Sequence, residues 1–377
     1  MDSTIKILDH GQEAFDHIFH RIDCARKSIQ VGCFVWRDDE TGRLTARHLL
    51  SAADRGVSVQ IRKDAMGAIY EYFDPNMLSF FHKKLSLSDR ARVEGLCAVY
   101  GHGSPRKQRP SPLAQALAAH PNIELHTNEK IYDHSKVFVF DEETIIVGGM
   151  GMGDDFRSRW VDFMVELDHP RYVERFRAHR LGPRPVDWDD AIDFVVNVFL
   201  PGGGKRFDVL PTRLAAISAA RRSIIMEMAY LGDSRITDAL VSALDRGLRV
   251  ELLVSGRANI QHDLNLRTIA ELFRRTRYPE LFHPYLHPRM LHSKLMIFDE
   301  AQAQIGSTNC TTVSHDGFEE TDVWIRHRPT VRRIVDVVRR HQAQSRFLTS
   351  PPLYSSLYAA IEKRLQDGHS HAPMDDG

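Results

Sequence analysis

The feature that most constrains this chain is a short motif that occurs twice with the same internal spacing. Each copy has the pattern His-x-Lys-x4-Asp, and the copies are His134-Lys136-Asp141 and His292-Lys294-Asp299. The register continues with a glycine and then an acidic residue, at Gly148 and Asp162 and at Gly306 and Glu320. Every residue of the first copy lies 158 positions (292 − 134) before its counterpart. A constant offset over this length indicates an internal duplication, so we expect two similar domains.

The duplication extends toward the N-terminus of each half. Residues 24–34 resemble residues 219–229, because in both a helix ends in basic residues and an apolar strand begins. Residues 49–56 and 240–247 each predict an amphipathic helix that is closed by a glycine before a Val-rich strand. Strands that alternate with helices predict an α/β fold with helices on the faces of each sheet. We therefore expect two α/β domains, each with a mixed, mostly parallel sheet.

The length of 377 residues suits two domains of ordinary size. Prolines at residues 183–185 break regular structure, so we predict one domain at 1–182 and another at 183–350, followed by a helix and flexible tail at 351–377. Gly56 precedes His134 by 78 positions, whereas Gly247 precedes His292 by 45, so the first domain carries an insertion of 33 residues. The aromatic residues of the insertion predict a capping helix packed on the domain, an element at a membrane surface or the wall of an acceptor site.

Composition narrows the classes of function. Lysines and arginines number 50 and so do aspartates and glutamates, which argues against a surface built throughout for nucleic acid but allows a local basic channel. The four cysteines have no CxxC spacing, so neither a disulfide framework nor a zinc site is indicated, and Cys33 is expected to be a buried thiol. No window approaches 18 consecutive apolar residues and no signal peptide is evident, which favours a cytoplasmic protein.

The motif residues have the chemistry that phosphodiester exchange requires. Side chains two positions apart on a strand face the same side, so each histidine projects together with its lysine. A neutral imidazole attacks phosphorus and a protonated one donates to the leaving oxygen, so two histidines can each take one role in a shared active site. The lysines Lys136 and Lys294 would neutralise the phosphate, a task that a metal ion performs elsewhere.

Other residues near the motifs have supporting roles in this interpretation. Ser307 and Asn309 are candidates to donate hydrogen bonds to phosphate oxygens. Asp162 and Glu320 are candidates for the carboxylate that fixes the tautomer of each histidine. Asp141 and Asp299 close their strands, and from position alone they are expected to hold backbone or turn groups. Each residue alone would be read as structural, and only the recurrence of the set in register indicates an active site.

The complete pattern at residues 292–309 resembles the signature of the phospholipase D superfamily, and the similarity spans most of the chain. Within that superfamily the sequence is most similar to bacterial cardiolipin synthases, through residues 5–11, 34–42, 53–57, 148–149 and 160–162. The resemblance implies two domains about a pseudo-two-fold axis and a phosphohistidine intermediate. It also implies transfer of a phosphatidyl group to an alcohol or water without metal or other cofactor.

The resemblance assigns roles to numbered residues. It implies that both histidines, both lysines and both motif aspartates belong to the catalytic set, with His134 as nucleophile and His292 as general acid. Ser307, Asn309 and Gly149 would contact the phosphate. The sequence departs from the synthases at Gly151, where these enzymes usually carry asparagine, so the first copy lacks one amide donor. The transmembrane segments common in the synthases are also absent.

The expected partners are an anionic phospholipid and an alcohol acceptor at the inner face of the membrane. Nucleic acid is not expected to be a partner, because a binding site for a duplex normally needs a basic stripe. No second chain is required for catalysis, because one chain carries both motifs. Two alternatives stay open: a nuclease or nucleic-acid phosphodiesterase with the same chemistry, and a non-catalytic phosphate-binding protein.

Overall fold

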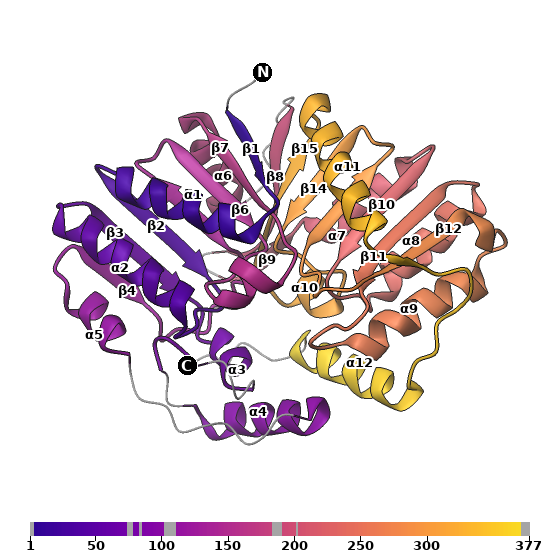
Figure 1. The fold of residues 1–377 in the computed structure, drawn as a ribbon, viewed down its shortest axis with the longest axis horizontal. Coiled ribbons are helices and arrows are strands. Elements are labelled where there is room, and N and C mark those ends of the chain that lie inside the picture. The colour runs from indigo at the N-terminus through magenta and orange to yellow at the C-terminus, as the bar shows by residue number, and fades with distance from the viewer. Residues whose placement is uncertain are drawn as a thin grey trace. The chain divides into compact units, whose positions relative to one another are not determined.

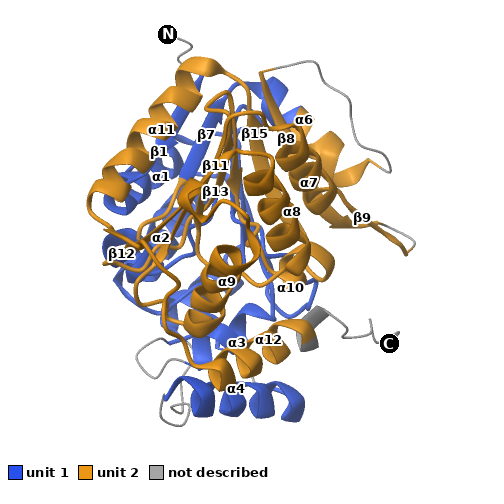
Figure 2. Ribbon diagram, turned by 90° about the vertical axis from the view of Figure 1, so that its right-hand side faces the viewer, with its two compact units in different colours: residues 1–160, 164–174 blue, residues 161–163, 175–377 orange. Residues whose placement is uncertain are grey.

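The computed structural model describes residues 4–73, 78–82, 85–101, 111–182, 191–200 and 203–370. The chain divides into two compact units, drawn in different colours in Figure 2. Unit 1 comprises Met1–Trp160 and Met164–Glu174, and unit 2 comprises Val161–Phe163 and Arg175–Gly377. Residues 183–185, where the sequence predicted a boundary, lie outside the described residues.

Unit 1 is built on a seven-stranded sheet with the order β1-β7-β6-β5-β2-β3-β4, flanked by helices (Figure 1). Its strands are β1 (Ile5–Leu8), β2 (Ser28–Cys33), β3 (Ser58–Lys63), β4 (Ile123–His126), β5 (Val137–Phe140), β6 (Thr144–Gly148) and β7 (Met164–Asp168). Its helices are α1 (Gly11–Cys24), α2 (Glu40–Asp54), α3 (Gly67–Tyr72), α4 (Leu87–Tyr100), α5 (Pro112–Ala119) and the short π-helix η1 (Asp155–Arg159), and α6 (Pro170–Leu181) begins in this unit and ends in unit 2.

Unit 2 is built on a nine-stranded sheet with the order β16-β12-β11-β10-β13-β14-β15-β8-β9. Its strands are β8 (Ile192–Phe199), β9 (Lys205–Phe207), β10 (Ser223–Met228), β11 (Arg249–Ser255), β12 (Phe282–His287), β13 (Lys294–Phe298), β14 (Gln302–Gly306), β15 (Glu320–Ile325) and β16 (Arg346–Phe347). Its helices are α7 (Val209–Ala219), α8 (Ser234–Asp245), α9 (His262–Arg275), the 3-10 helix η2 (Pro279–Leu281), α10 (Thr312–Asp316), α11 (Arg328–Ala343) and α12 (Ser356–Ser370).

The two sheets repeat one topology. The order β7-β6-β5-β2-β3-β4 in unit 1 corresponds strand by strand to β15-β14-β13-β10-β11-β12 in unit 2. Each motif histidine lies just before the corresponding strand, β5 or β13. The predicted duplication and the mixed α/β sheets flanked by helices are therefore confirmed.

The parallel part of each sheet is smaller than expected. In unit 1 only the β2–β3 and β3–β4 pairs are parallel, and β5, β6 and β7 pair antiparallel. Unit 2 has the same division, with parallel pairing confined to β10–β11 and β11–β12. Because short turns join β5 to β6 and β13 to β14, and such turns connect only antiparallel neighbours, the strand that follows each motif has to reverse direction.

The ends of the helices α2 and α8 show how the repeated sequence produces repeated structure. Asp39 caps α2 by accepting a hydrogen bond from the Gly42 amide at 3.0 Å, and Asp233 caps α8 by accepting one from the Arg235 amide at 3.0 Å. Both helices are followed by a glycine with positive φ, 91° at Gly56 and 89° at Gly247. This left-handed conformation favours glycine, which explains the repeated Arg-Gly ending.

The described part of the insertion packs against the rest of unit 1. Tyr72, Phe73 and Phe80 are buried, and the Phe80 ring stacks on Trp36 with ring centres 5.3 Å apart. The Cys97 thiol of α4 donates a hydrogen bond to the Phe73 carbonyl. The capping alternative is therefore the correct one for these aromatic residues. Residues 74–77, 83–84 and 102–110 of the insertion lie outside the described residues.

The expectation for Cys33 is confirmed. The residue is a buried free cysteine on the strand β2, where its side chain lies on the same buried face as those of Ile29 and Val31. Burial raises the pKa of its thiol to about 12. The thiol is therefore protonated at neutral pH and acts as a core side chain.

Candidate active site

In unit 1, His134 and Lys136 of the first motif lie together just before β5. The His134 ring meets the Phe34 ring edge-on with ring centres 4.9 Å apart. The Lys136 ammonium lies 5.4 Å from the centre of the Phe34 ring and donates a hydrogen bond to the His134 carbonyl. Because Lys136 is only 2% exposed, its charge acts in a less polar environment than water. The structure therefore holds the histidine and the lysine of the first copy together.

A carboxylate that the sequence interpretation missed supports this cluster. Asp64 follows β3, and its side chain accepts hydrogen bonds from the Met66 amide at 2.7 Å and the Asp133 amide at 2.6 Å. Burial raises the pKa of Asp64 to about 6. The Asp133 carboxylate in turn accepts from the Ser135 amide at 2.9 Å, so the backbone on both sides of His134 is held by a carboxylate. The only sequence signal was an aspartate at the end of a strand.

The glycines of the first copy are closely packed. Gly149 directly follows β6, at the position that Ser307 occupies after β14. A Cβ atom on Gly151 would lie 2.9 Å from Cε2 of Phe156 and 3.1 Å from its Cζ. The aromatic ring thus occupies the space in which an asparagine side chain would begin. The loss of the amide donor is therefore part of the packing of this loop.

In unit 2, His292 is paired with Asp162. The distance from His292 Nδ1 to Asp162 Oδ2 is 2.7 Å, and the two residues are 6% and 1% exposed. The backbone fixes this pair, because the His292 amide donates to the Val161 carbonyl at 2.7 Å and the Val161 amide donates to the Met290 carbonyl at 2.9 Å. A proton on Nδ1 that points at the carboxylate leaves the Nε2 lone pair as the reactive position of the ring.

Lys294 lies against the same ring. Its ammonium is 2.8 Å from Nδ1 and 3.1 Å from Nε2 of His292, and it also donates to the His292 carbonyl. Since Nδ1 carries the proton directed at Asp162, the hydrogen bond that the ammonium can donate to the ring goes to Nε2. The Tyr230 ring meets the His292 ring edge-on at 6.0 Å. The second copy therefore combines an oriented imidazole with a buried cation.

Ser307 and Glu320 form a second pair in unit 2. The Ser307 hydroxyl donates to Glu320 Oε2 at 2.5 Å and accepts from the Thr321 amide at 3.0 Å. Asn309 is 5% exposed, and its Oδ1 accepts no hydrogen bond from the described part of the chain. Gly306 cannot be replaced, because a Cβ atom there would lie 2.1 Å from Asp322 Oδ1. The residues predicted to bind phosphate thus follow a strand end that admits no side chain.

An arginine that sequence reasoning missed holds this loop in place. Arg213 on α7 is fully buried and donates to the carbonyl oxygens of Thr308 at 2.7 Å and Asn309 at 3.1 Å. It also donates to Gln304 Oε1 at 3.0 Å and Asp322 Oδ2 at 3.3 Å. In the sequence an arginine within an amphipathic helix resembles a solvated charge, and no pattern distinguished this one.

Asp141 and Asp299 lie at the opposite ends of β5 and β13 from the motif histidines. The Asp141 carboxylate accepts hydrogen bonds from the amides of residues 26–28, and the Asp299 carboxylate accepts them from the amides of residues 221–223. Burial raises the pKa of each carboxyl, but the backbone hydrogen bonds outweigh it and lower the pKa below its ordinary value. These contacts tie each motif strand to the start of its neighbouring central strand.

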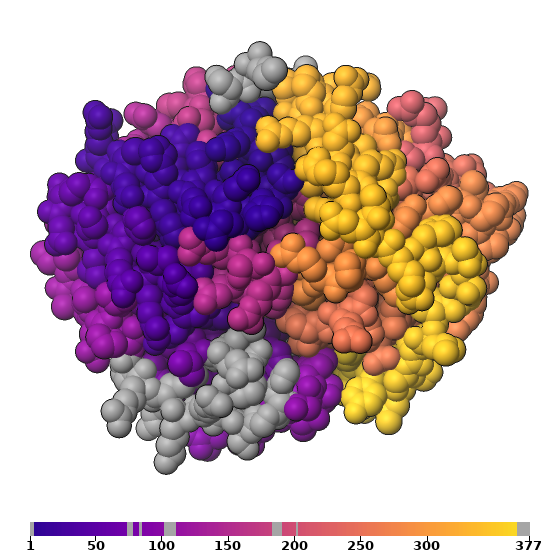
Figure 3. Space-filling model, viewed as in Figure 1, coloured from indigo at the N-terminus to yellow at the C-terminus, as the bar shows by residue number. Residues whose placement is uncertain are grey.

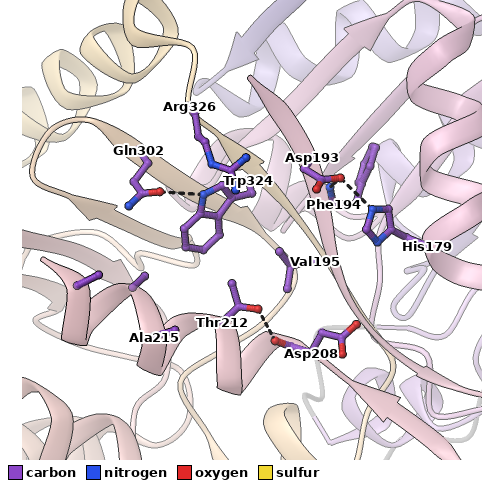
Figure 4. A pocket seen from close by; sticks show the side chains of 12 residues that line it. His179, Asp193, Phe194, Val195, Asp208, Thr212, Ala215, Gln302, Trp324 and Arg326 are labelled. Atoms are coloured by element: carbon purple, nitrogen blue, oxygen red, sulfur yellow. Dashed lines mark hydrogen bonds and ion pairs between the residues drawn. The ribbon is translucent and has the colours of Figure 1, made fainter. Parts of the chain in front are cut away.

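The hollow shown in Figure 4 lies away from these residues. It has a volume of about 390 Å³, and its lining includes Trp324, Arg326, Gln302, Asp193 and His179. Two of its charged or titratable side chains pair with each other, because Nε2 of His179 lies 2.9 Å from Oδ1 of Asp193. The Trp324 indole donates a hydrogen bond to Oε1 of Gln302. No motif residue lines this hollow. Within the described residues, no three His, Cys, Asp or Glu side chains are grouped as a metal ion would require.

Comparison with known proteins agrees with this arrangement. The family described as "Cardiolipin synthase, PLD-like domain", where PLD stands for phospholipase D, matches residues 18–179 and 214–341. Cardiolipin synthase B of Escherichia coli (strain K12) is 22% identical over 361 residues, which cover 86% of this chain and 77% of the relative. The major cardiolipin synthase ClsA of Bacillus subtilis (strain 168) is 21% identical over 372 residues, which cover 92% of this chain and 70% of the relative.

Solved structures show the same fold. A phosphatidylserine synthase from Haemophilus influenzae Rd KW20 has a TM-score of 0.68 at 12% identity, and the match covers 97% of this chain and 92% of that one. A polyphosphate kinase from Porphyromonas gingivalis has a TM-score of 0.56 at 11% identity, over 98% of this chain and 56% of that one. The family match covers both motifs and most of both units. The chain therefore belongs to the family of cardiolipin synthase-type, phospholipase D-like proteins.

Proposed function

We propose that this protein is a phosphatidyltransferase that transfers the phosphatidyl group of a glycerophospholipid to an alcohol, as in cardiolipin synthesis, through a covalent phosphohistidine. The observation that carries the proposal is the Asp162–His292–Lys294 constellation in unit 2. An imidazole whose Nδ1 proton is held by a carboxylate can exchange a proton or attack phosphorus through Nε2. The adjacent ammonium supplies positive charge for a phosphate.

The reaction would proceed in two displacements at phosphorus. In the first, Nε2 of His134 attacks the phosphorus of phosphatidylglycerol, the bond from phosphorus to the headgroup oxygen breaks, and His292 gives its proton to the leaving glycerol. In the second, His292 takes the proton of an acceptor hydroxyl, which attacks phosphorus and breaks the bond to His134. The assignment of nucleophile and acid follows the family. Asp162 stabilises the protonated form of His292, which is present before the first step and again after the second.

The remaining predicted residues would bind or support the phosphate. Lys136 and Lys294 would neutralise its charge, and Asn309 would donate its side-chain amide, with Ser307 and Glu320 shaping the same loop. The first copy would contribute through the loop at Gly149, without a side-chain donor. Asp141 and Asp299 would act at a distance from the reaction, because their carboxylates are engaged by backbone amides. The proposed site is therefore asymmetric, with more donors from the second copy.

The proposed substrate class is supported by the relatives. Relatives that the chain matches over most of its length are named cardiolipin synthases. We therefore propose an anionic glycerophospholipid as donor and place the reaction at the inner membrane face.

The test is to incubate the purified protein with phosphatidylglycerol in mixed micelles containing EDTA and to identify the lipids by mass spectrometry. Formation of cardiolipin is the expected result, and phosphatidic acid would be the product if water were the acceptor. The matched controls are His292→Ala, which should be inactive, and His327→Ala, which removes a histidine that pairs with Thr330 outside the motifs. Cleavage of single-stranded DNA without turnover of any lipid would contradict the proposal and favour a nuclease.

A further inference from the structure

The C-terminal helix α12 exposes two large apolar side chains near its start, while two polar side chains further along it are buried. A surface helix ordinarily buries its apolar side chains and exposes its polar ones. In α12 the buried positions include Glu362 and Gln366, whereas Leu357 is 68% and Tyr358 is 46% exposed. Tyr358 can hydrogen-bond to water through its hydroxyl, but Leu357 gains nothing from exposure. An exposed apolar side chain such as Leu357 marks an interaction site when other exposed apolar side chains lie beside it.

The polar contacts of α12 explain why it is held in this orientation. Glu362 accepts a hydrogen bond at 2.8 Å from the Leu264 amide in the first turn of α9, where helix amides have no partner of their own. Gln366 donates to the Leu231 carbonyl at 3.1 Å and to Gln261 Oε1 at 3.0 Å. These buried bonds orient the helix, so the exposure of Leu357 on the other side is enforced by the structure.

The segment before α12 adds a third exposed apolar side chain. Leu348 is buried before this segment, and the Ser355 amide donates to Asp263 Oδ1 at 2.6 Å after it. Between these two anchors Leu353 is 95% exposed. Leu353, Leu357 and Tyr358 therefore lie within six residues of one another at the start of α12, and we call these three side chains the apolar tip. The C-terminal part of the chain, yellow in Figure 3, lies at the molecular surface.

Basic side chains accompany the apolar tip. Arg274, in the last turn of α9, lies 5.8 Å from the centre of the Tyr354 ring and donates to its hydroxyl at 3.4 Å. Tyr354 is the side chain with which Arg274 interacts among the described residues. Arg364 is exposed and lies seven residues after Leu357, on the same side of α12. An apolar group with flanking arginines fits the headgroup region of an anionic bilayer, where the phosphates lie just outside the acyl chains.

We infer that the apolar tip, with Arg274 and Arg364 beside it, is the surface through which this protein docks on an anionic phospholipid bilayer. The inference rests on the proposed function, because a transferase of glycerophospholipids has to reach substrates that reside in a membrane. No helix among the described residues is long and apolar enough to cross a bilayer. Tyr72, Phe73 and Phe80 of the insertion are buried in unit 1, so these aromatic side chains do not form the docking surface.

The test is co-sedimentation of the full chain with vesicles of phosphatidylglycerol and phosphatidylcholine, compared with vesicles of phosphatidylcholine alone. The test variant is Leu353→Asp/Leu357→Asp. Its matched control is Leu181→Asp, which changes a leucine that is 70% exposed at the end of α6. We expect the double variant to lose at least about tenfold in vesicle binding and the control to bind like the wild type. Arg274→Gln should weaken binding to anionic vesicles by about fivefold and leave binding to neutral vesicles unchanged.

A second measurement separates docking from catalysis. Turnover of a short-chain phosphatidylglycerol below its micelle concentration needs no docking, so the double variant should match the wild type in this assay. Vesicle binding that depends on the two leucines, without turnover of any lipid, would support the docking surface and contradict the proposed function. Equal vesicle binding by the double variant and the wild type would overturn the inference. A wild-type dimer that becomes monomeric in the double variant would also overturn it, because the apolar tip would then be an interface between copies.

Discussion

Asp162 Oδ2 lies 2.7 Å from Nδ1 of His292, although 130 positions of sequence separate the two residues. The carboxylate that follows the first motif therefore orients the histidine of the second motif. This is possible because Val161–Phe163 belongs to the compact unit that contains His292 and is bonded to it through the backbone. A short segment that follows the first motif in the sequence thus belongs to unit 2.

Replacing Asp162 by asparagine should reduce kcat by about 10²- to 10⁴-fold with little change in KM, because the imidazole loses its fixed tautomer and the partner of its protonated form. The measurement is steady-state turnover of phosphatidylglycerol. Glu143→Gln, at an exposed residue of the turn between β5 and β6, is the control and should retain full activity. An Asp162→Asn variant with at least half of the wild-type kcat would show that this contact does not serve catalysis.

Replacing Arg213 by leucine should destabilise unit 2 by about 3–5 kcal/mol at pH 8, because Asp322 is left as a buried charge without its cation. Burial raises the pKa of Asp322 to about 6 in the intact protein. An acid with a raised pKa favours the folded state at low pH and loses that contribution as the pH rises through the folded pKa. The deficit should therefore shrink as the pH is lowered from 8 toward 5.5.

Urea unfolding at the two pH values measures this effect, with Arg332→Leu on the exposed side of α11 as the control. A deficit that is the same at pH 8 and pH 5.5 would mean that the charge on Asp322 is not its cause.

Glu166 should make unit 1 sensitive to acid. Burial alone would raise the pKa of Glu166, but hydrogen bonds from His17 and Arg21 outweigh it and lower the pKa to about 2. An acid with a lowered pKa stabilises the fold above its ordinary pKa near 4.5, and this contribution is lost as the pH falls through about 2. Glu166→Gln should cost roughly 1–3 kcal/mol at pH 7, and the difference from wild type should narrow below about pH 4.5.

Thermal unfolding of the wild type and Glu166→Gln between pH 7 and pH 3 gives this difference directly. Gln12→Glu, which alters an exposed side chain of the same helix α1, controls for the general effect of charge. If the gap between wild type and Glu166→Gln is constant over the pH range, the ion pairs of Glu166 do not stabilise unit 1.

The sequence predicted the duplication, the mixed α/β sheets and the identity of the motif residues, because spacing in the chain reports them directly. The histidine and the lysine of each copy meet because they are two positions apart in the extended chain that leads into β5 or β13. The order of the strands was not predicted, because the repeat shows that the two sheets are alike but not which strands are neighbours. The small proportion of parallel strand pairs was not predicted either. Each chain reversal after a motif depends on a short turn, and the periodicity of the strands does not report the length of that turn.

Contacts between distant segments could not be predicted in the same way. Asp162 and Glu320 occupy equivalent positions in the sequence, yet which histidine Asp162 meets depends on the path of residues 161–163 in space. Arg213 is another example, since its burial is set by the loop at Thr308 and not by neighbours in α7. The aromatic residues of the insertion were ambiguous for a related reason: only packing against Trp36 shows that Phe80 belongs to the core.

The central claim is that a motif histidine carries the phosphatidyl group between donor and acceptor. Intact-protein mass spectrometry after a rapid alkaline quench of the protein with phosphatidylglycerol, followed by peptide mapping, tests this claim most directly. We predict one phosphatidyl adduct, on His134 in the wild type, and no adduct in His134→Ala. An adduct on His292 would mean that His292 is the nucleophile and His134 is the general acid. An adduct on a residue other than these two histidines, or lipid turnover that continues in both His134→Ala and His292→Ala, would contradict the account.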